Sequence, residues 1–549
     1  MILSSAGIAD GTILETALCV VGAGPAGIVL GITAAEAGLP VLILESGGLR
    51  PDDASQALCA GQVEQGVRHP PAMTYRRRGL GGSSTLWGGR CVPLDPIDFE
   101  ERDWLDLPST WPIRYETLLP YWVRAHGWAE LGRFEYAAAA ALPCGMRPMV
   151  TTIDDDTIST EQIERFSPPT DFGRRYRKRL ECAANVRVLL NATCINIALT
   201  QGGGAVRQLE SVTQAGSRIQ VRAGAYVLAM GGLEVPRLLL ASRARVAQHL
   251  ANEDGALGRF YMCHLAATLG DFLPTDGHAP WHFYQRDPDG VYCRRRFSIK
   301  ASAQRTHQIG NIVARFHHPL VANPAHGSGA LSLLYFGSRL LPAEYAQRNA
   351  ENNSYAALQH VYNVAVDASG AARFAAHCAR RRWLARRKLP SVVIAPPRNM
   401  YTLEVHAEQL PCRESRITLA AEADPLGVPK LRIGWRAQAA DFRTVRVGTG
   451  LIAAALAKAG RGRMLFDPDA AEARIADAGA YGGHHLGAAR MSQSAQTGVV
   501  DADCRVHGVG NLYVASGAVF PTSGQANPTL TILALALRLA DHLVAQFAR

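Results

Sequence analysis

Residues 17–45 read ALCVVGAGPAGIVLGITAAEAGLPVLILE, and this stretch decides the fold class. An apolar, strand-like run leads into Gly22-x-Gly24-x-x-Gly27, an alanine-rich helix follows, and a second apolar run ends at Glu45. Gly22 permits a tight turn, Gly24 lets the backbone approach a pyrophosphate, and Gly27 allows helix and strand to pack closely. The pyrophosphate would lie at the helix N-terminus, where unpaired N–H groups favour negative charge. We therefore predict an α/β protein with a Rossmann-like dinucleotide-binding domain.

The motif does not choose between NAD and FAD, although Glu45 stands where it could accept hydrogen bonds from a ribose diol. Residues 79–90, GLGGSSTLWGGR, combine five glycines with three hydroxyl residues. Such a loop can lay bare backbone against a flat aromatic ligand. Residues 225–242, AYVLAMGGLEVPRLLLAS, predict a strand, a turn and a helix without a second G-x-G-x-x-G. A separate nicotinamide-binding domain is therefore not supported, and FAD is favoured.

The composition describes a soluble globular protein of two or three domains, because 549 residues are 48% hydrophobic and 19% charged. We see no apolar run of about 18 residues, the length needed to span a bilayer. The N-terminus lacks a basic stretch and a cleavage site, so we expect a cytoplasmic location. Eleven cysteines are scattered without a C-x-x-C pair. They are expected to be free thiols, and no metal site is predicted.

The net charge of +10 is partly concentrated in GRRYRKR (173–179) and RRRWLARRK (380–388). A solvated helix face is the first interpretation of each cluster. A surface for anionic lipid or an acidic partner is the second. The sequence contains no nucleic-acid-binding motif, so charge alone does not indicate a nucleic-acid partner.

Further stretches strengthen the flavin interpretation. They are WPIRYETLLPYW (111–122), AEQLPCRESRITLAAEADPLGVPKLRIGW (407–435), HHLGAARM (484–491) and PTSGQANPTLTILALAL (521–537). With the N-terminal motifs they resemble the glucose–methanol–choline (GMC) flavoprotein oxidoreductases. The C-terminal pattern is most similar to the sugar-oxidising branch around pyranose oxidase and the bacterial glycoside oxidases. Little family signal lies between residues 265 and 395.

The resemblance implies a Rossmann-like FAD-binding domain built from three segments, and a sheet-and-helix substrate domain. The implied FAD-binding segments are 13–115, 170–260 and 476–549, with a cap segment at 116–169 and a substrate-binding domain at 261–475. The implied cofactor-binding residues are Gly22, Gly24, Gly27, Glu45, Gly81, Gly82, Ser83, Ser84, Trp87, Gly88, Cys194, Gly517, Pro528 and Thr529. Leu86 stands where pyranose oxidase has the histidine that links covalently to FAD, so non-covalent FAD is expected. Gly487-Ala488 replaces the usual Gly-Thr.

The resemblance also indicates catalytic residues. Oxidising an alcohol to a carbonyl transfers a hydride to flavin N5 and needs a base for the proton, a role suited to histidine. The family's catalytic histidine stands three residues before the motif glycine, which is His484 here. His485 should serve packing or orient a neighbour. Asn527 would reach the substrate oxygen and, followed by Pro528, is also expected to be the N-cap of an apolar helix. The positive end of that helix would stabilise charge on the reduced flavin.

Three positions remain ambiguous. Thr193-Cys194 resembles the place where the family's backbone contacts adenine, but a plain strand end explains it equally well. His264 and His406 could line the substrate cavity, although a satisfied core histidine is the simpler interpretation of each.

The leading hypothesis is an FAD enzyme that oxidises a secondary hydroxyl of a sugar or glycoside. The sequence does not separate oxidase from dehydrogenase, so O₂, a quinone or another acceptor remains open, as does the oligomeric state. Membrane-surface contact is the less favoured possibility. Two alternatives are a non-redox FAD lyase of the same family and a subunit that needs a partner to accept electrons.

Overall fold

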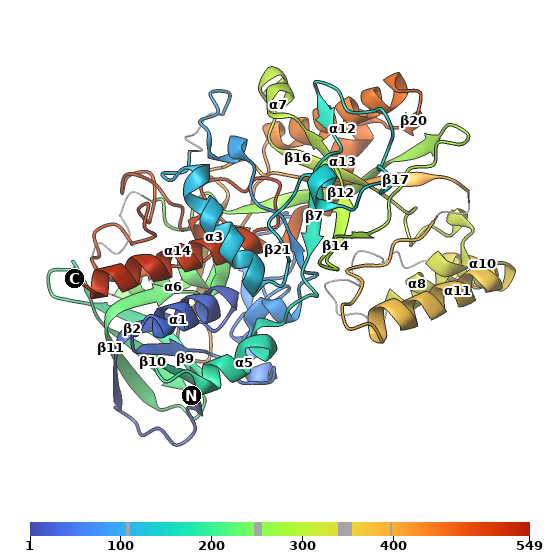
Figure 1. Cartoon of the computed structure of the whole chain (residues 1–549). Coiled ribbons are helices and arrows are strands. Elements are labelled where there is room, and N and C mark those ends of the chain that lie inside the picture. Colours follow the sequence, from blue (N-terminus) through green and yellow to red (C-terminus); the bar gives the residue numbers. More distant parts are fainter. Residues whose placement is uncertain (106–109, 246–254, 339–353, 396–397) are drawn as a thin grey trace.

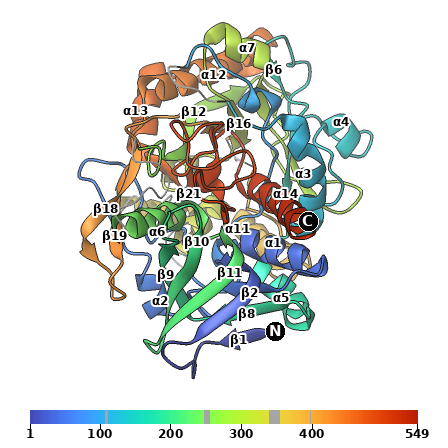
Figure 2. The same ribbon diagram turned by 90° about the vertical axis from the view of Figure 1, so that its left-hand side faces the viewer.

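The computed structural model describes residues 1–105, 110–245, 255–338, 354–395 and 398–549. Its first sheet has eight strands in the order β1-β8-β3-β2-β11-β10-β9, with β22 beside β11 (Figures 1 and 2). The strands are β1 (Ile2–Ser4), β2 (Ile13–Val21), β3 (Val41–Leu44), β8 (Val186–Leu190), β9 (Ala192–Leu199), β10 (Val206–Thr213), β11 (Arg218–Leu228) and β22 (Leu512–Val514). Five neighbouring pairs are parallel, and β9 and β10 extend the sheet as antiparallel strands.

The turn between β2 and α1 (Pro25–Glu36) shows why glycine is needed at two positions. Gly22 has a φ of +104°, and a Cβ there would lie 2.7 Å from the carbonyl oxygen of Ala229. A Cβ on Gly27 would lie 1.9 Å from the carbonyl oxygen of Gly22. Both substitutions would force helix α1 away from the sheet. The predicted Rossmann-like architecture is confirmed at this point.

Helices α1, α3 (Tyr115–Trp128) and α14 (Thr529–Phe547) pack together beside this sheet, although they come from distant parts of the chain (Figure 1). Their side chains share one hydrophobic core with β2, β3 and β11. By length and composition α14 could cross a membrane, and it is the one helix in the described ranges that meets that test. More than half of its apolar stretch is buried inside the protein. The burial fits the core helix that the sequence predicts.

A second sheet of seven strands has the order β20-β12-β17-β16-β15-β6, with β21 beside β12. Its members are β6 (Ile158–Ser159), β12 (Met262–Pro274), β15 (Phe297–Ile299), β16 (Ile312–His317), β17 (Tyr401–Ala407), β20 (Gly462–Leu465) and β21 (Ala480–Leu486). Helices α12 (Ala439–Lys458) and α13 (Pro468–Ala478) pack against it and enclose a second hydrophobic core. The two sheets therefore have separate cores, as a two-part architecture requires.

Smaller elements complete the molecule. One four-stranded sheet contains β5 (Arg90–Cys91), β7 (Ile163–Phe166), β13 (Gln285–Arg286) and β14 (Tyr292–Arg295), and a three-stranded sheet contains β4 (Gly61–Val63), β18 (Arg416–Ala423) and β19 (Pro429–Gly434). The other helices outside the helical unit described next are α2 (Asp53–Ala57), α4 (Ala138–Ala141), α5 (Phe172–Cys182), α6 (Gly231–Arg245), α7 (Ala301–His307), η1 (Gly82–Thr85), η2 (Pro96–Phe99), η3 (Pro324–His326) and η6 (Gly517–Val519). The domain boundaries stay predictions.

A helical unit stands apart from both sheets, at the right of Figure 1. It consists of α8 (Gly329–Ser338), α10 (Ser354–Val366), α11 (Ala368–Cys378) and a π-helical turn, η5 (Ala379–Trp383). Its helices contact one another. All eleven cysteines of the protein are free thiols, in agreement with their scattered positions.

Candidate active site

A cavity of about 1210 Å³ lies between the two sheets. Most of the residues predicted to bind the cofactor line it, together with both predicted catalytic residues. The lining set contains Gly22, Gly24, Glu45, Gly82, Ser83, Ser84, Trp87, Gly88, Cys194, His484, Gly517, Asn527, Pro528 and Thr529. Motifs that lie about 500 residues apart in the sequence are thus brought together in one cavity by the fold.

Two predicted residues, Gly27 and Gly81, are not among those that line the cavity. Gly27 allows the close packing of α1 described above. Gly81 has a φ of +98°, and its N–H donates to the carbonyl oxygen of Ala23 at 2.8 Å. These two glycines therefore shape the backbone that surrounds the cofactor space.

The cavity fits a dinucleotide at the start of α1. Gly24 is the N-cap of this helix, and no side chain caps the first N–H groups. A Cβ on Gly24 would meet no protein atom within 4 Å, unlike one on Gly22 or Gly27. The space beside Gly24 and the uncapped N–H groups are the two features that an incoming pyrophosphate needs.

Glu45 directly follows β3 and is buried. Its carboxylate accepts hydrogen bonds from the N–H groups of Ala23, Gly47 and Gly79, at 2.8 to 2.9 Å. A carboxylate offers about four acceptor positions, so one remains for a ribose hydroxyl. Glu45 therefore holds the loops together as well as lining the cavity, and the ribose contact stays a prediction.

The glycine-rich loop is fixed by its polar side chains. Ser84 donates to the carbonyl oxygen of Gly81 at 2.6 Å and accepts from the N–H of Phe172 at 3.1 Å. The indole N–H of Trp87 donates to the carbonyl oxygen of Thr170 at 2.9 Å. Cys194 lies near the start of β9 and lines the cavity. The loop is thus anchored on one side while its backbone faces the cavity.

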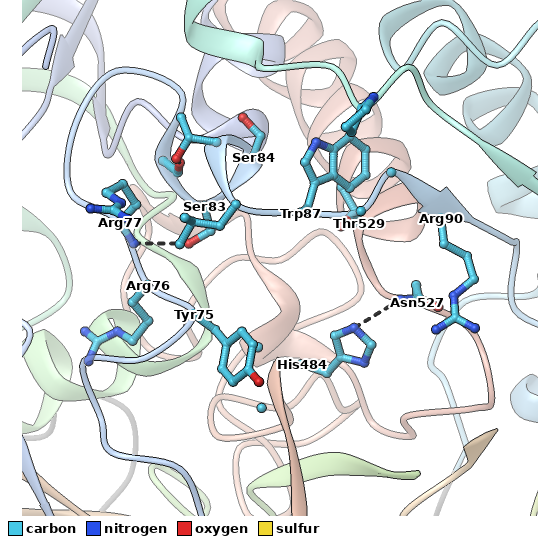
Figure 3. A pocket seen from close by; sticks show the side chains of 18 of the residues that line it. Tyr75, Arg76, Arg77, Ser83, Ser84, Trp87, Arg90, His484, Asn527 and Thr529 are labelled. Carbon is cyan, nitrogen blue, oxygen red and sulfur yellow. Dashed lines mark hydrogen bonds between the residues drawn. The ribbon is translucent and has the colours of Figure 1, made fainter. Parts of the chain in front are cut away.

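His484 and Asn527 lie next to each other in the wall of the cavity (Figure 3). The side-chain nitrogen of Asn527 lies 3.1 Å from Nε2 of His484. The expected N-cap role of Asn527 is wrong by one residue, because Pro528 is the N-cap and α14 begins at Thr529. The Asn527 amide is turned to His484 and makes no cap hydrogen bond. The N-terminus of α14 still opens on the cavity through Pro528 and Thr529.

Behind His484 lies a third histidine that the sequence left ambiguous. Nδ1 of His264 is 2.9 Å from Nδ1 of His484, and the two rings meet edge to face. The ring of His406 stacks on His264, with centroids 4.5 Å apart, and its Nδ1 donates to the carbonyl oxygen of Gln525 at 2.9 Å. Burial lowers the pKa of His264 to about 4. At neutral pH His264 is therefore uncharged.

These contacts fit the following proton arrangement. An Asn527 N–H donates only if Nε2 of His484 carries no proton. His484 then carries its proton on Nδ1 and donates to Nδ1 of His264, which places the His264 proton on Nε2. Nε2 of His264 is buried and has no hydrogen-bond partner among the described residues, although the nearby carbonyl groups of Gly524 and Ser523 act to raise the pKa of His264. In this arrangement Nε2 of His484 carries no proton, and the role of His484 as a base stays a prediction.

His485 also lines the cavity, but its ring bonds to a different cluster. Its Nδ1 lies 2.6 Å from the hydroxyl of Tyr261, which is also 2.8 Å from Nε2 of His69 and 3.3 Å from Sγ of Cys263. Burial lowers the pKa of His485 well below its ordinary value. This agrees with the prediction that His485 serves packing or orientation.

Two groups of potential metal ligands occur in the described part of the chain: His69, Cys263 and His485, and the trio His264, His406 and His484. Within each group the donor atoms lie within 4.8 Å of one another. The Tyr261 hydroxyl is already bonded to all three members of the first group. Two members of the second group are bonded to each other. We assign no metal to either group, and the absence of a metal site stays a prediction.

The second sheet presents charged side chains to the cavity. Strand register places Glu404 opposite Arg315 on β16 and Thr268 on β12. Because side chains alternate along a strand, Glu404 shares a face of β17 with His406, whose ring lies 5.7 Å from that of His484. Burial would raise the pKa of Glu404, but Arg315 holds it well below its ordinary value, so the group is ionised.

Arg90 extends this polar wall from the glycine-rich loop, and Figure 3 shows its side chain near Asn527. Its Nη1 lies 3.4 Å from Oε1 of Glu164, which is also ion-paired with Arg315. Burial would lower the pKa of Arg90, but Glu164 raises it, so the guanidinium stays charged. The cavity therefore offers fixed hydrogen-bond donors and acceptors close to His484.

Comparison with known proteins decides the family. The GMC oxidoreductase family model matches residues 411–536. The 2-methyl-1,2-propanediol dehydrogenase of Mycolicibacterium austroafricanum is 22% identical over 97% of this chain and 96% of that protein. The paromamine 6'-oxidase of Streptomyces fradiae is 35% identical over 24% of this chain and 23% of that protein. The chain belongs to the GMC oxidoreductase family. It is accordingly an FAD-dependent oxidoreductase, as the predicted resemblance implied.

Solved structures support the GMC fold. Formate oxidase of Aspergillus oryzae superposes with a TM-score of 0.56 at 18% identity, over 98% of this chain and all of that one. The observations made above at Gly24 and at the N-termini of α1 and α14 fit FAD. The mixed α/β fold class and the enzyme class are therefore confirmed, whereas the roles of individual site residues stay predictions.

Sequence reasoning missed the charged wall entirely, because Arg90, Glu164, Arg315 and Glu404 come from four strands with no motif in common. It noticed His264 and His406 but not their pairing with His484. The available signal was the alternation in YTLEVHAEQ (401–409), which places Glu404 and His406 on one face of a strand.

Proposed function

We propose that this GMC oxidoreductase oxidises a hydroxyl group of a polyhydroxylated substrate, a sugar or glycoside, with His484 as the base. Bound FAD would supply the hydride acceptor. The observation that carries the substrate class is the ionised wall of Glu404, Arg315, Glu164 and Arg90 next to His484. Carboxylates accept and guanidinium groups donate hydrogen bonds, so the wall can satisfy several substrate hydroxyls.

The proposed proton path uses atoms already in contact. Nε2 of His484 takes the hydroxyl proton, and the Asn527 amide, now 3.1 Å from that atom, turns to hold the substrate oxygen. Protonated His484 keeps its Nδ1 proton in the bond to His264. His264 is thus a positioning residue, which holds the ring in the tautomer whose Nε2 carries no proton.

The relatives support alcohol oxidation. They are named as dehydrogenases and oxidases, and the one from Streptomyces fradiae is named for its action on paromamine. This naming does not favour the lyase alternative, which we do not propose further. We also propose that FAD is bound non-covalently, because Leu86 has no nucleophilic atom. Acid precipitation should leave all of the flavin in solution, and flavin in the pellet would contradict this.

An anaerobic titration tests the substrate class. We expect sugars or glycosides to bleach the flavin at concentrations at which ethanol and benzyl alcohol do not. Glu404→Gln should lower kcat/KM for the best sugar by about 10- to 100-fold, the cost of losing hydrogen bonds to a charged group. Glu422→Gln, an exposed glutamate on β18, is the matched control and should change nothing. Equal bleaching by simple alcohols, or an unaffected Glu404 variant, would contradict the proposal.

A further inference from the structure

The two basic clusters differ in the structure. On α5, Arg175, Arg177 and Arg179 form ion pairs with Glu130, Glu181 and Glu36 at 2.7 to 3.1 Å. This matches the solvated helix face expected from the sequence. Segment 380–388 is different, because Arg380, Arg381, Arg386 and Lys388 are exposed and have no ion pair within the described residues.

Segment 380–388 also exposes large apolar side chains between its charges. Trp383 is 74% exposed and Leu384 is 82% exposed. A solvated basic face gains nothing from an exposed indole beside an exposed leucine, since both would be stabilised by leaving water. Tryptophan flanked by arginine and lysine is typical of segments that lie at a lipid–water interface.

Helix α10, in the same helical unit, exposes a second apolar row. Leu358, Val361, Tyr362 and Val366 are between 56% and 71% exposed. Their spacing of three and four residues puts them on one face of the helix. The opposite face is buried, because His360 and Asn363 bond to Ser332 of α8. This apolar face has no covering element in the part of the chain that the structure describes.

The net positive charge of residues 354–388 indicates which kind of partner this surface binds. Residues 354–388 contain seven arginine or lysine residues and a single acid, Asp367. Asp367 is used within the unit, where it caps α11 and accepts from the N–H of Gly329. A second copy of the chain would bring the same positive charge, which would oppose pairing of these faces. An anionic surface with an apolar interior satisfies both the charges and the exposed rings.

We propose that the helical unit formed by α8, α10, α11 and η5 docks the protein on an anionic lipid surface, anchored by segment 380–388. The position of the cavity gives this docking a purpose. Phe374, Cys378, Arg382, Trp383, Lys388 and Leu389 all line the cavity that reaches His484. The docked protein would therefore hold the mouth of its cavity against lipid. This inference does not depend on the proposed substrate.

Vesicle binding by the intact holoenzyme tests the proposal. Phosphatidylcholine vesicles with and without phosphatidylglycerol are sedimented with the protein at low and high salt. We expect binding only with phosphatidylglycerol and at low salt. Arg380→Gln/Arg381→Gln/Arg386→Gln should weaken it about 100-fold, since each basic residue near the membrane contributes about fivefold. Trp383→Ser/Leu384→Ser should also weaken it, with the charges intact.

The control is Arg174→Gln/Lys178→Gln, which removes two exposed charges from the other basic cluster on α5. It should bind vesicles within twofold of the parent protein, and every variant should retain FAD. Absence of binding to phosphatidylglycerol vesicles would overturn the proposal, as would equal loss in the α5 control. Light scattering tests for a dimer. A dimer that is lost in Leu358→Ser/Tyr362→Ser would assign the α10 face to a second copy of the chain and overturn the proposal for that face.

Discussion

Replacing His264 tests whether the histidine behind the proposed base has a catalytic purpose. Its Nδ1 lies 2.9 Å from Nδ1 of His484, and burial keeps its pKa near 4, so it accepts a hydrogen bond as a neutral ring. When His484 takes the substrate proton, this bond becomes charge-assisted and contributes about 1.5–3 kcal/mol. His264→Leu should therefore slow flavin reduction by about 10- to 100-fold and leave KM for the sugar nearly unchanged.

The pH profile separates this role from a structural one. An acceptor at Nδ1 stabilises protonated His484, so its removal should lower the pKa of the base. The acid limb of kcat/KM would then move to lower pH in His264→Leu. His264→Asn offers an amide oxygen at a similar position and should recover most of the rate. Stopped-flow flavin reduction across pH measures both effects. If His264→Leu reduces its flavin within twofold of the parent rate and the acid limb of kcat/KM does not move, the reasoning is refuted. If His264→Asn and His264→Leu lose the same rate, His264 serves only packing.

Three further predictions follow from other parts of the molecule. Gly24→Val should yield apoprotein, because the side chain fills the open space at the start of α1; retained stoichiometric FAD by absorbance would contradict this. Burial would raise the pKa of Glu234, but Arg78 and Arg76 lower it to about 2. The ionised carboxylate therefore contributes to the free energy of unfolding, and this contribution is lost as the pH falls from about 4.5 to 2. Urea unfolding should show the difference between parent and Glu234→Gln shrinking over that range, and a constant difference would refute the assignment. A lipid-soluble quinone in phosphatidylglycerol vesicles should take the two electrons and two protons of sugar oxidation anaerobically, and Trp383→Ser/Leu384→Ser should slow quinol formation.

Local motifs were predictable because their physics is local. The need for glycine at 27 depends on a contact within one strand–turn–helix unit, which the quoted stretch contains. At Gly22 the positive φ is local, but the close approach is to Ala229 just after the end of β11, outside that stretch. The family motifs likewise located the residues that line the cavity. The start of α14 was misplaced by one residue, since Asn527 has two possible partners and only the tertiary structure shows that it bonds to His484.

The remainder depended on pairing between distant strands. His264 on β12 and His406 on β17 meet because those strands are neighbours in the second sheet, although 142 residues separate them. The wall of Arg90, Glu164 and Glu404 arises in the same way. The exposure of Trp383 could not be inferred from RRRWLARRK either, because a tryptophan in such a segment could equally have turned inward. Such features need the register and packing of the whole fold.

The central claim is that His484, and not its neighbour His485, is the base. This claim is tested by anaerobic stopped-flow measurement of flavin reduction with the best sugar from the titration. The proteins compared are the parent, His484→Ala and His485→Ala. We expect His484→Ala to keep its FAD and reduce about 10²- to 10⁴-fold more slowly, and His485→Ala to lose far less. Unchanged reduction in His484→Ala, or a greater loss in His485→Ala, would contradict the account.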